Sequence, residues 1–168
     1  MATIVKTSDF EDGILRIAQD KYDDFSSYLS EVKENSLIKH IFGATEGDKL
    51  IADLTGDPRV PVSSIWLDIW DPFEFSIQEH SYYCVGIKEV ILMLTYREIV
   101  GEMGVVNLQT GNKKIKGQAT EGQGIIRKEV VIHNRAAMSV ATLQKYIQEN
   151  GITYPDYSGD TLQMESMI

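Results

Sequence analysis

The chain has 168 residues, a formal net charge of −9 and a hydrophobic content of 43%, which suit one folded domain with a substantial core. Its single cysteine, Cys84, excludes an intrachain disulfide framework. No apolar run has the length of a signal peptide or a membrane span. The acidic balance argues against a protein that grips nucleic acid, because phosphate binding needs clustered Lys and Arg. We therefore expect a soluble protein of a reducing compartment.

The first third of the chain predicts helices over about residues 9–54. Ser8 and Glu11 have the spacing of a capping box. Apolar residues then recur at steps of three and four, which places them on one helix face. These residues are Ile14, Ala18, Tyr22, Phe25, Leu29 and Val32. Gly43 separates this helical region from a short helix that ends before the turn signal at Thr55–Pro58.

Residues 56–84 combine three prolines with a high density of aromatic side chains, which argues against a long helix. We predict an irregular insertion with short strands near residues 63–69 and 74–77. Large hydrophobic side chains here either fold back over their own bundle or form an interface with another subunit, where Trp and Tyr are enriched. The candidate interface residues are Trp66, Trp70, Phe73 and Phe75.

Residues 86–103 predict a central helix that is apolar on several faces, so it is expected to be buried on several sides. Residues 104–128 contain five glycines and five basic residues against one acidic residue, and predict an extended, β-like arm. The arm is interpreted as an ordinary loop, a nucleic-acid contact or, the interpretation we favour, a contact with the acidic body of a neighbouring copy. Its candidate interface residues are Leu108, Thr110, Lys113, Lys114 and Lys116.

The last helix is predicted over residues 129–150, followed by an extended tail at 151–168. One face of this helix carries Ile132, Ala136, Val140, Leu143 and Ile147. We expect the tail, like the arm, to embrace neighbouring subunits. Its candidate contact residues are Tyr154, Pro155 and Tyr157. The predicted fold class is mainly α: a small helical bundle in a single domain, residues 1–168, with an aromatic-rich insertion, an extended arm and a tail.

The chain offers little for catalysis or metal binding. His80 and Cys84 have i, i+4 spacing, but two ligands are too few for a tetrahedral site. Cys84 with His80 as its base would make a thiol nucleophile, whereas a small buried residue is the favoured interpretation. The carboxylates Asp68, Asp71 and Glu74 fit an acidic solvated loop better than a cation site. We predict no catalytic residue, no metal site and no cofactor.

Three runs of sequence resemble the head–tail connector proteins of tailed bacteriophages, including ring proteins of crAss-like phages. Residues 22–54 are similar to the amino-terminal part of the family, where a helix ends in a Leu/Phe–Gly step before a short helix. Residues 86–118 are similar to the central helix and the arm. Residues 134–159 are similar to the last helix and the Tyr-Pro-acidic-aromatic ending. The insertion at 56–84 has no counterpart in this pattern.

The resemblance implies a structural protein of the virion, found at the head–tail junction and, during assembly, in the host cytoplasm. Its partners are further copies in a roughly dodecameric ring, the portal protein, and tail or further ring proteins. Such a ring extends the DNA channel and docks the tail, and an acidic channel wall lets DNA pass without specific binding. No membrane is implied. The alternatives are a tail-completion or stopper protein of the same particle, and a bacterial helical protein-interaction module.

Overall fold

A computed structural model describes residues 2–11, 15, 28–109, 118–160 and 162, with the backbone alone for 101–109 and 118–127. Helices predominate in these residues: η1 Thr7–Phe10, a 3-10 turn, then α1 Glu31–Phe42, α2 Ala44–Asp53, α3 Ser64–Leu67, α4 Gly86–Gln109 and α5 Gln118–Glu149. Two antiparallel pairs of strands complete the fold: β1 Leu54–Thr55 with β2 Val60–Pro61, and β3 Phe73–Ile77 with β4 His80–Cys84. The prediction of a mainly α fold with an aromatic-rich insertion is confirmed.

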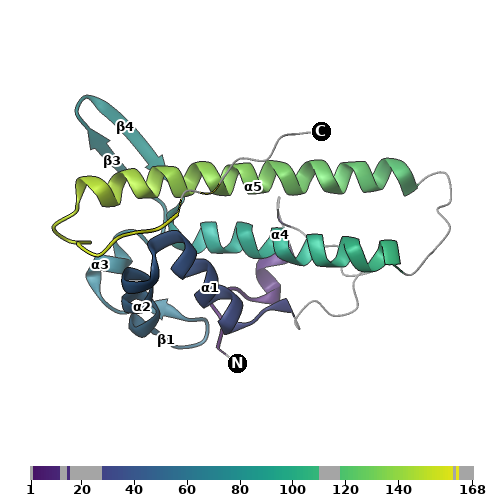
Figure 1. Cartoon of the computed structure of the whole chain (residues 1–168), viewed down its shortest axis with the longest axis horizontal. Helices are drawn as coiled ribbons and strands as arrows, with labels where there is room; N and C mark the ends of the chain where they lie inside the picture. The colour runs from purple at the N-terminus through teal and green to yellow at the C-terminus, as the bar shows by residue number, and fades with distance from the viewer. Residues whose placement is uncertain (1, 12–14, 16–27, 110–117, 161, 163–168) are drawn as a thin grey trace.

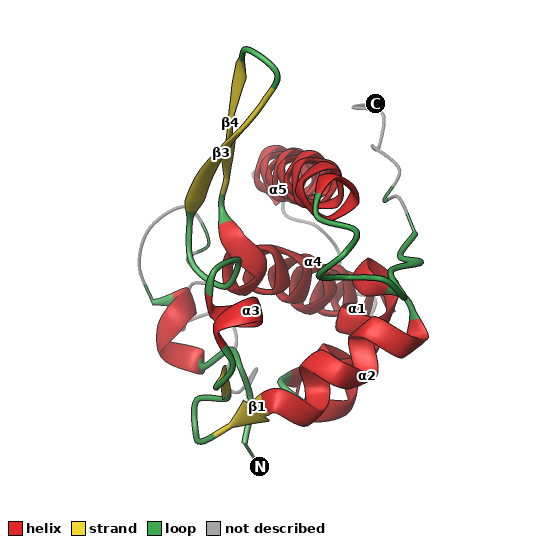
Figure 2. Ribbon diagram, turned by 90° about the vertical axis from the view of Figure 1, so that its left-hand side faces the viewer, coloured by secondary structure: helices red, strands yellow, loops and turns green. Residues whose placement is uncertain are grey.

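Helix α4 lies in the middle of the molecule. Figure 1 shows α5 on one side of α4 and the α1–α3 region on the other side. Figure 2, turned by a quarter, shows the same order and the β3–β4 hairpin standing beside α5. Residues on several faces of α4 are buried, among them Ile87, Met93 and Tyr96. The predicted central helix is therefore confirmed, and its start at Gly86 agrees with the sequence.

The core face of α5 is the one that its spacing predicts, because Ile132, Ala136, Val140, Leu143 and Ile147 are all buried. These side chains join one continuous core with α1 and α4. The helix ends at Glu149, one residue before the predicted end at residue 150.

The prediction of helix continuing through residue 30 is wrong. Ser30 is extended, and its side chain accepts a hydrogen bond from the Lys33 N–H, so it caps a new helix that begins at Glu31. Val32 therefore does not lie on a buried face as predicted, and its side chain is 72% exposed. The other predicted positions of that face before residue 28 lie outside the described residues.

The predicted extended arm is also wrong over most of its length. Residues 104–109 continue α4, and residues 118–128 belong to α5. Each glycine lowers helix stability by about 1 kcal/mol, an amount that packing against a second helix can offset, and α4 and α5 pack against each other. Leu108 lies in α4, but its side chain is not among those described. Thr110, Lys113, Lys114 and Lys116 lie outside the described residues.

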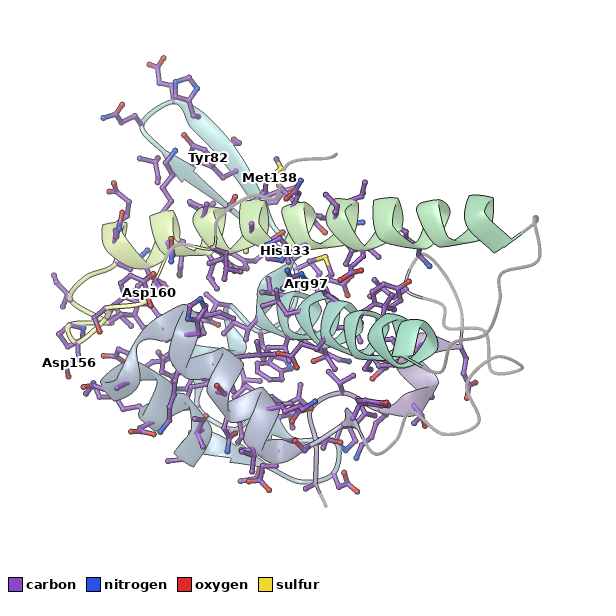
Figure 3. The ribbon with its side chains drawn as sticks, turned by 45° about the vertical axis from the view of Figure 1, so that its right-hand side comes forward. Tyr82, Arg97, His133, Met138, Asp156 and Asp160 are labelled. Carbon is purple, nitrogen blue, oxygen red and sulfur yellow. The ribbon has the colours of Figure 1, made fainter. Side chains whose placement is uncertain are left out.

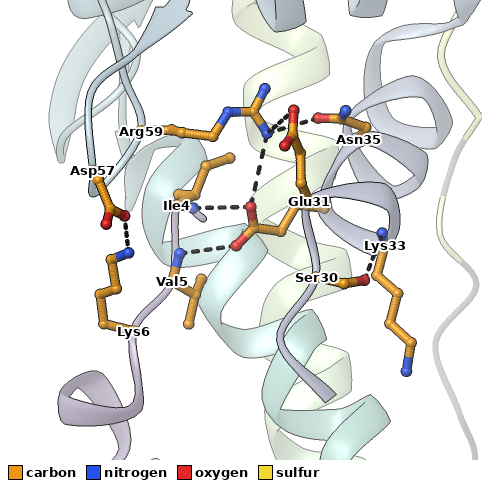
Figure 4. A network of polar contacts seen from close by, with 10 residues as sticks. Ile4, Val5, Lys6, Ser30, Glu31, Lys33, Asn35, Asp57 and Arg59 are labelled. Carbon is orange, nitrogen blue, oxygen red and sulfur yellow. Dashed lines mark hydrogen bonds and ion pairs between the residues drawn. The ribbon is translucent and has the colours of Figure 1, made fainter. Parts of the chain in front are cut away.

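A buried carboxylate fixes the N-terminal segment to α1 (Figure 4). The backbone N–H groups of Ile4 and Val5 donate to the two carboxylate oxygens of Glu34, over 2.8 and 2.9 Å. The Arg59 guanidinium lies 4.0 Å from the same carboxylate and donates to Asn35. Burial raises the pKa of Glu34 above its ordinary value. One side chain thus joins the N-terminus, α1 and the β1–β2 turn.

The described part of the tail contacts α1 of its own chain, and its predicted contact with neighbouring subunits stays a prediction. The Ser158 N–H donates to the Phe42 carbonyl over 3.2 Å, and the Asp160 N–H donates to the His40 carbonyl over 3.0 Å. Gly159 lies between them, where a Cβ would stand 1.7 Å from the Ile41 carbonyl oxygen. The close approach of two backbones therefore requires glycine at this position.

Candidate interaction surface

The tryptophans of the insertion belong to the core of their own chain. Trp66 and Trp70 are buried, and the Trp66 ring contacts Phe42 and Tyr154 at centroid distances of 5.7 and 5.4 Å. The prediction of a strand near residues 63–69 is wrong, because helix α3 lies there. Of the two interpretations of the insertion, folding over its own bundle describes both tryptophans. Neither ring is available to a partner in this structure.

Phe73 and Phe75 anchor the β3–β4 hairpin to α5. The strand predicted near residues 74–77 is confirmed as β3. Both phenylalanine rings are half-buried and meet Tyr146 edge-on, at 5.0 and 5.2 Å. The Lys145 ammonium lies 4.5 Å from the Tyr82 ring centroid on the other strand, and Figure 3 labels Tyr82 on this hairpin.

The three candidate residues of the tail have different surroundings. Tyr154 is buried and its hydroxyl donates to the Ile65 carbonyl over 2.9 Å. Tyr157 is half-buried, and burial raises its pKa to about 12. Pro155 is exposed. Of the three, Pro155 alone is exposed.

The geometry separates His80 from Cys84. Both lie on β4, four residues apart, and an extended strand places them about 13 Å from each other. Cys84 is buried at the base of the hairpin, and burial raises the pKa of its thiol. His80 cannot act as its base in this arrangement. Within the described part of the chain, no group of three His, Cys, Asp or Glu residues could hold a metal ion, and no helix there is long and apolar enough to cross a membrane.

Four large hydrophobic side chains are exposed along the segment from β2 to α3: Val60, Val62, Ile65 and Leu67. Strand β2 turns Val60 outward and buries Pro61, and Val62 is again exposed, at 63%. The Asp53 carboxylate accepts hydrogen bonds from the N–H groups of Val62 and Ser63, each over 2.9 Å, which fixes this segment. With two exposed carboxylates that follow α3, the segment forms what we name the acidic patch: Val60, Val62, Ile65, Leu67, Asp68 and Asp71.

A second surface lies on the outer side of α5. Met138, 61% exposed, points away from α4 in Figure 3, whereas the labelled His133 lies between the two helices. Val131 is seven residues earlier, on the same outward face, and is also exposed. Two exposed basic side chains accompany them. We name this surface the basic strip: Val131, Arg135, Met138 and Lys145.

The two surfaces carry opposite charge. The acidic patch carries Asp68 and Asp71 and no Lys or Arg, whereas the basic strip carries Arg135 and Lys145 and no Asp or Glu. In a chain with a net charge of −9, this acid-free stretch of α5 is a local exception. Each surface therefore combines apolar area with charge of one sign.

Neither surface was among the predicted site residues, although the sequence contained a signal for one of them. Val131 and Met138 are apolar residues that lie off the stripe of Ile132, Ala136 and Val140, and a solvent-facing helix side is normally polar. The acidic patch lies within the predicted insertion, but its segment was interpreted as a strand followed by an acidic loop, and its aliphatic residues were not singled out.

Comparison with protein-family models, with curated proteins and with solved structures finds no match.

Proposed function

We propose that this chain is a structural subunit that assembles with copies of itself into a ring at the head–tail junction of a tailed bacteriophage. In this role the ring extends the DNA channel below the portal and gives the tail a docking surface. No catalytic step and no cofactor are part of the proposal.

One observation carries the proposal: large apolar side chains are exposed along the segment from β2 to α3 and on the outward face of α5. Single exposed hydrophobic residues are normal, whereas contiguous ones mark interaction surfaces. The exposed groups on β2–α3 and on α5 belong to segments held by hydrogen bonds and by helix packing. Their exposure is therefore not a consequence of loose local structure.

A sequence resemblance supports the assignment of this assembly to the head–tail junction. It covers residues 22–54, 86–118 and 134–159, which are similar to head–tail connector proteins. The acidic net charge is compatible with a channel through which DNA passes without binding.

Electron microscopy of the purified chain mixed with the portal protein of the same phage tests this proposal. We expect a ring of added density on one end of the portal particle. A tail-completion or stopper protein would add density below an existing connector and leave the bare portal unchanged. A bacterial interaction module would leave the portal unchanged and remain monomeric or dimeric. Either result would reject the ring.

A further inference from the structure

We infer that the acidic patch of one copy binds the basic strip of a second copy, so that the ring grows by a head-to-tail contact. The inference rests on the proposed function, because it names the two surfaces through which the proposed ring would form. It assigns the interaction to residues that were not among the sequence candidates.

The chemistry of the two surfaces is complementary. The acidic patch offers four exposed aliphatic side chains bordered by Asp68 and Asp71, and no Lys or Arg lies in residues 60–87. The basic strip offers Val131 and Met138 with two cations, and no acidic residue lies in residues 130–148. Contact would bury apolar area at the centre and pair opposite charges at the rim, which is the usual anatomy of a specific interface.

The positions of the two surfaces require two copies. Helix α5 lies on one side of α4, and β2 and α3 lie in the region on the other side (Figures 1 and 2). One molecule cannot bring the two surfaces together without unpacking α4 from its neighbours. A contact between different surfaces leaves one of each kind free at the ends of a growing chain, and it stops only when the chain closes as a ring.

Within the basic strip, the exposed apolar residues are the appropriate positions to change. Lys145 donates to the Tyr82 hydroxyl over 3.2 Å, so its substitution would also disturb the β3–β4 hairpin. Met138 and Val131 have no such second role among the described contacts, and replacing them with Gln keeps helix propensity and charge. In the acidic patch, Val62→Gln and Ile65→Gln make the equivalent change.

The test mixes two blocked variants. The patch variant (Val62→Gln with Ile65→Gln) keeps an intact basic strip, and the strip variant (Val131→Gln with Met138→Gln) keeps an intact acidic patch. Val32→Gln is the matched control, because Val32 is an exposed valine on α1 outside both surfaces. Circular dichroism and thermal unfolding establish that each variant is folded, and sedimentation velocity over a concentration series measures assembly.

We expect the wild type and Val32→Gln to assemble beyond the dimer. Each blocked variant alone should need at least about tenfold more protein to assemble, which corresponds to the loss of a few buried apolar groups. An equal mixture of the two should form heterodimers that do not grow. If the wild type assembles and both blocked variants assemble equally well, the surface assignment is wrong while the ring proposal stands. If the wild type is monomeric at every concentration and does not bind the portal, both are wrong.

Discussion

Glu34 offers the sharpest test of how the fold is held together. The substitution Glu34→Ala removes the acceptor of two buried backbone N–H groups, those of Ile4 and Val5. Leaving a buried donor without a partner costs about 1–3 kcal/mol. The buried carboxylate also carries a desolvation cost, which is what raises its pKa. The substitution removes this desolvation cost and so offsets part of the cost of the two unpaired donors. We therefore expect the free energy of unfolding to fall by about 3 kcal/mol.

Urea unfolding followed by circular dichroism measures this change, and a thermal scan should show a midpoint lower by about 6–12 °C, given the usual 2–4 °C per kcal/mol for a chain of this size. Glu31→Ala is the matched control. Glu31 lies on the same helix, 3.7 Å from the same Arg59 guanidinium, but its side chain is 41% exposed. We expect the control to cost less than about 1 kcal/mol.

The comparison separates two explanations of the network. If the carboxylate acts as an acceptor for the N-terminal backbone, Glu34→Ala is much more destabilising than Glu31→Ala. Equal losses for the two variants would mean that charge near Arg59 is what matters, and the reasoning from the backbone hydrogen bonds would be refuted.

Three further predictions concern the tail, pH and salt. Gly159→Ala should destabilise the protein by about 1–3 kcal/mol in urea unfolding, because its Cβ would meet the Ile41 carbonyl. Gly151→Ala should be neutral, because a Cβ there would lie 3.5 Å from the Gln148 carbonyl oxygen, an ordinary contact distance. The pKa of Tyr157 is raised to about 12, so its unfolded form ionises first. Stability should fall as pH rises from about 10 to 12, and less steeply in Tyr157→Phe; parallel curves would contradict this. Assembly through the charged rims should weaken as salt is raised; strengthening would indicate a contact dominated by apolar burial.

Hydrophobic periodicity correctly predicted the helices that pack through an apolar face. The stripe of α5 and the start of α4 at Gly86 follow directly from spacing and from the glycine. Gly86 is needed there because its φ is +83° and a Cβ would stand 2.5 Å from the Trp70 carbonyl. These features depend on local sequence, so sequence reasoning could reach them.

The errors occurred where tertiary contacts decide. The glycines of residues 104–128 indicated an arm, yet the described parts of that range are helical because two long helices pair. The aromatic density of the insertion fitted either an interface or a fold back over the bundle, and only the structure shows that Trp66 and Trp70 complete the core. The aliphatic residues of the acidic patch are exposed because the other elements leave them uncovered, and a single sequence does not specify that.

The molar mass of the assembled protein tests the central claim most directly. Light scattering coupled to size-exclusion chromatography, run on the wild type at increasing concentration, should show a species whose mass is a fixed multiple of 18.9 kDa, and that multiple should stop increasing once the ring closes. A mass of 18.9 kDa at every concentration, unchanged when portal protein is added, would contradict the proposal that this chain is a ring subunit.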